Sequence, residues 1–148
     1  MKYNSNLEPA EMSYFRLNLL SFLRDAHPDK ANDLSFIAGR GDMAAEAYSE
    51  AIKSGLDHIQ AGEIANVVLF EDLHFSPYST IIEVLRNEFS REIAEDTIHK
   101  IAENLLWKCK DIFEKYDLDD NFSETPKYSL LYSELTGKIQ IIFENGIQ

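Results

Sequence analysis

Residues 92–116 read EIAEDTIHKIAENLLWKCKDIFEKY, and this stretch decides the fold class. Its apolar residues recur at intervals of three and four, which is the spacing of one face of an α-helix. The apolar residues are Ala94, Ile98, Ile101, Ala102, Leu105, Leu106, Cys109, Ile112, Phe113 and Tyr116. The stretch therefore predicts one long amphipathic helix.

The segments before it show the same interval. Residues 9–26 predict a helix that Pro28 ends, because proline disfavours helical backbone at the residue before it. Residues 33–54 predict a second helix, although Gly39 and Gly41 interrupt it. Two interior glycines cost a helix about 2 kcal/mol relative to alanine. We expect one helix with a weak first half, and the alternative is a helix that begins only near Gly41.

Residues 57–73 follow Gly55, which suits the end of the preceding helix. This segment is apolar on nearly all sides, and a helix of that kind is usually buried. We therefore expect it to be the central helix. Ser76 and Pro77 predict the start of the next helix, since serine caps helix N-termini and proline suits the first position.

The last helix is predicted over residues 126–145, beginning at Thr125-Pro126 and ending at Gly146. A short strand at 139–142 is the weaker alternative, because that β-branched run also fits the helical interval. The predicted fold is an all-α, single-domain multihelical bundle of about six helices over residues 1–148. Residues 1–8 are expected to be flexible.

Composition narrows the function classes. The 148 residues include 14 Lys and Arg against 26 Asp and Glu, which gives a net charge of -12. Nucleic acids and anionic membranes are bound through clusters of Lys and Arg, so the charge disfavours both as direct partners. A single cysteine, the lack of a signal-peptide pattern and the lack of a long apolar run predict a soluble cytoplasmic protein.

One string has the spacing of a metal-binding motif. Glu71 and His74 form an E-x-x-H pair, which di-metal four-helix proteins use. Such a site needs a second copy, and the nearest one, Asp96 to His99, has aspartate in place of glutamate and lies off the apolar stripe. No phosphate-binding, dinucleotide or paired-cysteine motif is present. We therefore expect no metal and no cofactor.

A polar corner at the same place is the candidate functional site. Glu71, His74, Ser76 and Tyr78 bring together residue types from which an acid–base pair with a hydroxyl partner is built. The alternative, which we favour, is structural: Ser76 caps a helix, Tyr78 packs, and His74 bonds a carbonyl at the end of the preceding helix.

Cys109 and Trp107 of the 92–116 stretch are candidate functional residues. Cys109 could act as a nucleophile, but it lies at the centre of the apolar stripe, where a thiol behaves as a small hydrophobe. We expect it to be structural. Trp107 lies beside the stripe, so it is expected to be half exposed and is a candidate contact surface. Of these two roles we favour half-buried packing.

Two further strings resemble known motifs but do not predict a site. Residues 117–121 alternate oxygen ligands as a calcium loop does, but Phe122 replaces the required glycine and Tyr128 the required glutamate. This segment is expected to be a solvated acidic turn. The tripeptide Arg40-Gly41-Asp42 matches a cell-adhesion motif, but strings of three residues arise by chance and this one has a helical context.

Three strings together resemble a known family: SYFRL at 13–17, LHFSPY at 73–78 and LYSELTG at 131–137. The chain is similar to an uncharacterised family of small helical proteins from gut and oral anaerobic bacteria, a domain of unknown function often encoded on conjugative elements. The resemblance covers residues 12–148 and implies a helical fold and a genomic setting. It implies no activity and no site residue.

Three functional hypotheses follow. The favoured one is a non-enzymatic accessory or interaction protein with an unidentified protein partner, linked to mobile genetic elements; the sequence leaves a homo-oligomer open. The second is an acidic protein that mimics nucleic acid and inhibits a DNA-processing enzyme, since its charge imitates phosphates. The third is a small enzyme that uses the His74 and Tyr78 corner, which requires a pocket that these side chains enter.

Overall fold

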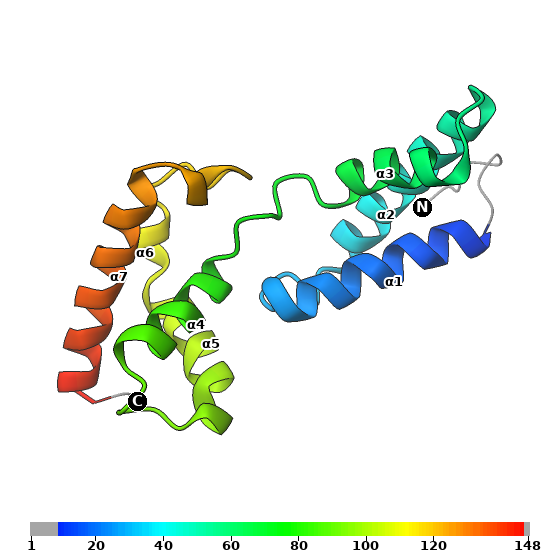
Figure 1. Cartoon of the computed structure of the whole chain (residues 1–148). Helices are drawn as coiled ribbons and strands as arrows, with labels where there is room; N and C mark the ends of the chain where they lie inside the picture. The colour runs from blue at the N-terminus through cyan, green and yellow to red at the C-terminus, as the bar shows by residue number, and fades with distance from the viewer. Residues whose placement is uncertain (1–8, 147–148) are drawn as a thin grey trace. The chain divides into compact units, whose positions relative to one another are not determined.

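The computed structural model describes residues 9–146, with side chains from Tyr14 onward, and they form seven α-helices and two short 3-10 helices without a strand (Figure 1). The elements are α1 (Pro9–Ala26), α2 (Leu34–Lys53), α3 (His58–Leu69), α4 (Pro77–Glu88), η1 (Glu95–Thr97), α5 (Ile98–Lys108), α6 (Lys110–Phe113), η2 (Phe122–Glu124) and α7 (Lys127–Glu144). The predicted all-α class is confirmed, and the alternative strand at 139–142 is wrong because those residues belong to α7. The expectation for residues 1–8 lies outside the described part.

The contacts within this all-helical domain group into two compact units, residues 1–71 and 72–148. None of the helices that the structure describes is long and apolar enough to cross a membrane.

In the first unit, α2 packs against both α1 and α3. A bidentate ion pair joins α1 to α2: Nη2 of Arg16 lies 2.7 and 2.8 Å from the two carboxylate oxygens of Asp42, and Nε lies 3.0 Å from one of them. Tyr48 of α2 lies against Phe15 of α1, with ring centroids 6.1 Å apart. The buried residues of α2 and α3 are mostly alanines, which allows helices to approach closely: Ala44, Ala45 and Ala51 on α2, and Ala61 and Ala65 on α3.

The ends of α2 and α3 follow local sequence signals. Asp33 caps α2 by accepting a hydrogen bond from the Phe36 amide, so the helix begins at Leu34 and contains both interior glycines. The prediction of one helix from residue 33 is confirmed. Gly55 follows α2 with φ of +102°, a left-handed conformation that glycine adopts without steric cost. Asp57 and Gln60 then cap α3 with reciprocal side-chain to backbone bonds.

The prediction that residues 57–73 form the buried central helix is wrong. Three of the twelve residues of α3 are buried, Ala61, Ala65 and Leu69, and they form a narrow stripe. Its larger apolar side chains are exposed: Ile59 by 64%, Ile64 by 43% and Val67 by 71%. An apolar side chain need not be buried, and α2 covers only the small-residue side of this helix.

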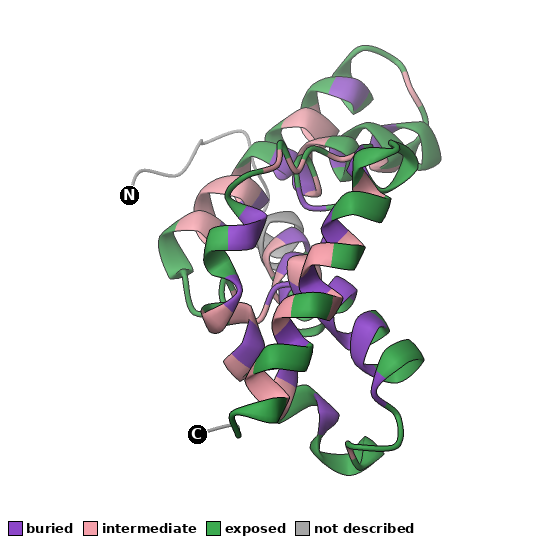
Figure 2. Ribbon diagram, turned by 90° about the vertical axis from the view of Figure 1, so that its left-hand side faces the viewer, coloured by how far each residue is buried: buried purple, intermediate pink, exposed green. Residues whose placement is uncertain are grey.

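In the second unit, α4 is the central helix. It packs against α5 and α7, and six of its twelve residues are buried (Figure 2). The fully buried core of this unit includes Ile81, Val84, Leu85, Leu105, Cys109, Leu131, Leu135 and Ile139. Tyrosine hydroxyls of α7 add polar contacts to α4, because Tyr128 donates to Glu83 at 3.1 Å and Tyr132 to Glu88 at 3.0 Å.

The predicted long helix at 92–116 is broken. Its apolar stripe does face the core, but the backbone forms η1, α5 and α6 in turn, with Cys109 between the last two at φ of -101° and ψ of 10°. Beyond this break the hydrogen bonds tighten: the Ile112 amide bonds the Cys109 carbonyl and the Tyr116 amide bonds the Phe113 carbonyl, each over three residues. Periodicity reports which side is buried, not the dihedral angles, so it did not reveal the break.

The last helix confirms its predicted extent within one or two residues, but not its predicted cap. The Thr125 hydroxyl donates backwards to the Phe122 carbonyl at 2.8 Å, and α7 begins at Lys127 without a side-chain cap. At the other end Gly146 has φ of +82° and ends the helix as predicted.

The two glycines of α2 provide a matched test of this packing. A Cβ added at Gly41 would lie 2.7 Å from Cγ of Arg16 and 3.2 Å from its backbone nitrogen, whereas one added at Gly39 would meet nothing within 4 Å. We expect Gly41→Ala to lower the free energy of unfolding by roughly 1–3 kcal/mol, because α1 must move. Gly39→Ala should raise it by about 0.5–1 kcal/mol through helix propensity. Urea unfolding measures both, and effects of the same sign would contradict this account.

Candidate functional site

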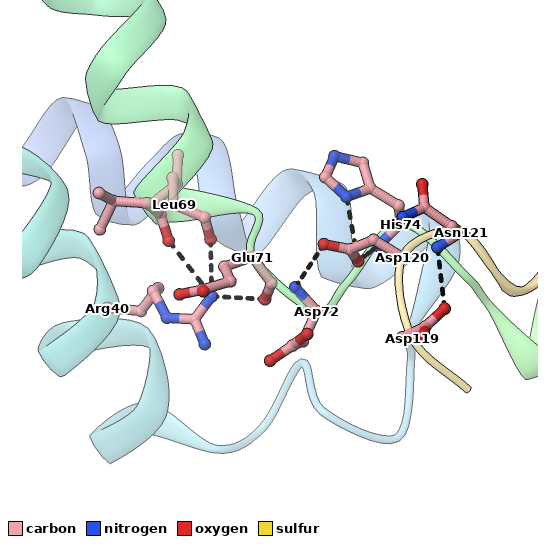
Figure 3. Close-up of polar contacts among 9 residues, drawn as sticks. Arg40, Leu69, Glu71, Asp72, His74, Asp119, Asp120 and Asn121 are labelled. Atoms are coloured by element: carbon pink, nitrogen blue, oxygen red, sulfur yellow. Dashed lines mark hydrogen bonds and ion pairs between the residues drawn. The ribbon is translucent and has the colours of Figure 1, made fainter. Parts of the chain in front are cut away.

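Asp120 organises the chain just before α4 (Figure 3). Its two carboxylate oxygens accept hydrogen bonds from the backbone amides of Asp72 and His74, each at 3.0 Å. The His74 ring lies on the same carboxylate, with Nδ1 3.0 Å from Oδ1. Asp72 has φ of +63°, an uncommon left-handed conformation outside glycine, and this carboxylate holds it in place.

The electrostatics of Asp120 follow from these contacts. Partial burial acts to raise the pKa of its carboxyl group, but the two backbone amides and the His74 ring outweigh it and hold the pKa below the usual range. The expectation of a merely solvated acidic turn at 117–121 is therefore wrong for Asp120. His74 is also not where we expected it, since its ring contacts this carboxylate instead of a carbonyl at the end of α3.

Arg40 takes the role that we had predicted for His74. Its Nη1 atom lies 2.8 Å from the Glu71 carbonyl oxygen and 3.3 Å from those of Val68 and Leu69 (Figure 3). The Val68 and Leu69 carbonyls belong to the C-terminal end of α3, and the Glu71 carbonyl follows just after it. Carbonyls at a helix C-terminus lack intrahelical partners and carry partial negative charge. Glu71 thus contributes its backbone, and its side chain is exposed.

The tripeptide at residues 40–42 is structural throughout. Arg40 caps α3, Gly41 admits the backbone of α1, and Asp42 pairs with Arg16. No local sequence signal indicates the contact of Arg40 with α3, because Arg40 and its acceptors are 28 to 31 residues apart in the chain.

Ser76 and Tyr78 occupy the roles expected of a folding corner. Ser76 is buried and its hydroxyl accepts a bond from the Ser79 amide at 2.9 Å, which confirms it as the N-cap of α4. Tyr78 is 4% exposed, and its hydroxyl lies 2.8 Å from Nδ1 of His99. Burial, followed by the negative charge of Glu103, raises the pKa of Tyr78. Sequence reasoning missed His99 as its partner.

Each of the four candidate residues is thus held by a different partner. Glu71 belongs to the first unit, whereas His74, Ser76 and Tyr78 belong to the second. No group of three His, Cys, Asp or Glu side chains that could hold a metal ion is found in the part of the chain with described side chains. The geometry of these residues supports caps and packing rather than a shared reactive centre.

Cys109 is fully buried between α5 and α6. Burial raises the pKa of its thiol to about 11, although the charge of Lys138 opposes the shift. The thiolate that nucleophilic chemistry requires is therefore scarce near neutral pH, and the position supports the structural role.

Trp107 is a large aromatic residue that the fold leaves exposed. Its side chain on α5 is 74% exposed, which is more than the half exposure we predicted. It borders an open depression of about 560 Å³, lined also by Lys108, Lys110, Asp111, Glu114, Lys138 and Ile142. The Lys110 amino group lies 5.7 Å from the centroid of the Trp107 ring, within range of a cation–π interaction.

These features define an all-helical protein whose candidate reactive side chains serve the fold and whose exposed tryptophan borders a depression. The chain belongs to the family described as domain of unknown function DUF1896, whose model matches residues 7–147. The fold is similar to the crystal structure of protein PG0816 from Porphyromonas gingivalis, at 38% sequence identity and a TM-score of 0.88, over 92% of this chain and 93% of that one. No curated protein matches the sequence. The resemblance to a bacterial family of unknown function is thereby confirmed.

Asp120→Asn tests the carboxylate that holds residues 72–74. It should lower the free energy of unfolding at neutral pH by roughly 1–2 kcal/mol, because the asparagine side chain has one acceptor oxygen and its NH2 group cannot accept the second backbone bond. Since the native pKa of Asp120 is lowered, its stabilisation is present above the ordinary aspartate pKa of about 3.9 and is lost as the pH falls through the native value.

The control for this experiment is Asp117→Asn. Asp117 is exposed and has no polar partner among the described residues, so the change should stay within about 0.5 kcal/mol. Urea unfolding at several pH values should show the Asp120→Asn deficit shrinking in acid. A deficit that is independent of pH, or equal in the two variants, would refute the assignment.

Cys109 should be inert in the folded protein. Its burial and raised pKa predict that a thiol reagent such as dithiobis(nitrobenzoate) does not label the native chain at about pH 8 but labels it fully in denaturing urea. Absorbance of the released thiolate measures both. Rapid labelling under native conditions would show that the α5–α6 region opens.

Proposed function

We propose that this chain is a non-enzymatic interaction protein that binds a protein partner through the surface around Trp107. The observation that carries the proposal is the 74% exposure of this side chain in a unit that has a buried aromatic and aliphatic core of its own. Tryptophan is enriched among the residues that dominate binding energy at protein interfaces. Its exposure in the free protein is expensive in solvation terms, and a partner would relieve it.

The polar corner supports the same conclusion indirectly. Ser76 and Tyr78 are committed to the N-cap and the core of α4, and His74 is committed to Asp120. A general base must reach a bound substrate, so side chains engaged in this way favour a binding role over a catalytic one.

The genomic setting remains part of the proposal. The family resemblance favours gut and oral anaerobes and conjugative elements, and the composition favours a cytoplasmic location. A protein encoded on a mobile element and lacking an activity of its own would act as an accessory to the proteins of that element.

Affinity purification from the native host tests the proposal, with the full-length tagged chain compared with Trp107→Ala. The intact chain should retain a partner in near-stoichiometric amount, and the variant should lose it by at least about tenfold, which corresponds to 1.4 kcal/mol of binding energy.

Leu130→Ala is the matched control, because Leu130 is 60% exposed on α7 and does not line the depression. It should retain the partner as the unaltered chain does. Equal recovery with Trp107→Ala, or no partner under native conditions, would overturn the proposal.

A further inference from the structure

We infer that the depression beside Trp107 binds an acidic peptide segment of the partner, one that carries an apolar side chain among its carboxylates. The inference rests on the proposed function and specifies the chemistry of its partner.

Positive charge gathers at this depression in an otherwise acidic protein. Three lysines, Lys108, Lys110 and Lys138, are among its lining residues, out of 14 Lys and Arg in a chain of net charge -12. None of these three amino groups forms an ion pair with a carboxylate among the described residues, whereas Lys115 pairs with Glu134. Unpaired lysines beside an exposed aromatic ring are complementary to carboxylates of a partner.

The depression also has an apolar component. Ile142 lines it together with the Trp107 ring, and the two offer a contact for one apolar side chain of the occupant. The indole N–H of Trp107 has no hydrogen-bond acceptor among the described residues, so it is available to a peptide carbonyl or a carboxylate. An apolar anchor flanked by acidic residues satisfies both kinds of contact.

A peptide fits this depression better than a nucleic acid does. Asp111 and Glu114 line it beside the lysines, so three positive and two negative charges meet there. A nucleic-acid strand carries regularly spaced phosphates and would bring some of them against these carboxylates. A peptide places its acidic and neutral residues at separate positions and can avoid that repulsion.

Selection from a random dodecapeptide library on the immobilised full chain tests the inference, with Trp107→Ala used to discard peptides that bind elsewhere. Peptides that require Trp107 should be rich in Asp and Glu around an aromatic or aliphatic residue. The affinity of the best tryptophan-free peptide can be followed by intrinsic fluorescence, because the chain has a single tryptophan.

Charge reversal of lysines inside and outside the depression gives the matched comparison. Lys138→Glu should lower the affinity for the selected peptide at least about tenfold. Lys110→Glu should lower it as much, and because Lys110 is exposed this change leaves the core packing intact. Lys127→Glu, on α7 outside the depression, should change the affinity less than about twofold. Added salt should weaken binding to the unaltered chain.

Other outcomes would overturn the inference. If the peptides that require Trp107 are neutral or basic, the acidic chemistry is wrong and the proposed function survives. If no peptide requires Trp107, the inference and the proposed function both fail. Tighter binding of a twelve-nucleotide oligothymidine, in competition with the peptide, would assign the depression to nucleic acid instead.

Discussion

The chain between α3 and α4 must satisfy backbone groups that neither helix can satisfy. The last carbonyls of α3 have no amide partners, and the amides of Asp72 and His74 follow directly after them in the sequence. Arg40 meets the carbonyls with a cation and Asp120 meets the amides with an anion. Each charge suits the group that it binds, because carbonyl oxygens attract positive charge and amide hydrogens attract negative charge. One contact lies within each unit. Arg40 stabilises the end of α3, and Asp120 stabilises the backbone that precedes α4.

This constraint accounts for the polar residues that gather near the start of α4. A histidine, a serine and a tyrosine gather near the start of α4, but each is engaged: His74 with Asp120, Ser76 with an amide and Tyr78 with His99. Polar residues concentrate at such places because backbone groups there need partners. The same residue types would mark an active site only if they faced a common cavity.

The sequence predicted the fold more fully than it predicted the contacts that hold it. Helix class and most helix ends were predictable, because apolar spacing and capping residues act locally, as Asp57 and Ser76 illustrate. The burial of α3 was not predictable from the sequence, since Ala61 and Ala65 are buried while Val67 is exposed. Which side of an apolar helix is covered depends on its neighbours, and periodicity carries no information about them.

At the candidate site, too, local features were predictable and contacts between distant residues were not. The exposure of Trp107 was predictable, because its place beside the stripe follows from helical geometry alone, but the 74% found exceeds the half exposure that we predicted. Arg40 was not predictable as a cap, because its acceptors lie 28 to 31 residues away in sequence. The lysines beside Trp107 were also invisible as a group: Lys108 and Lys110 are neighbours in sequence, but Lys138 reaches the same depression from another helix.

Net charge and local charge therefore carry different information about this protein. A net charge of -12 acts on approaching polyanions from all sides, and at physiological ionic strength it is screened beyond about 8 Å. Within that distance an approaching molecule meets individual residues, and at the depression three lysines outnumber two acids. Short acidic segments experience the local excess of positive charge, whereas a long polyanion also experiences the acidic surface around it. The composition alone disfavoured nucleic acid but gave no positive indication of a partner, and it is the position of Lys138 next to Trp107 that supplies one.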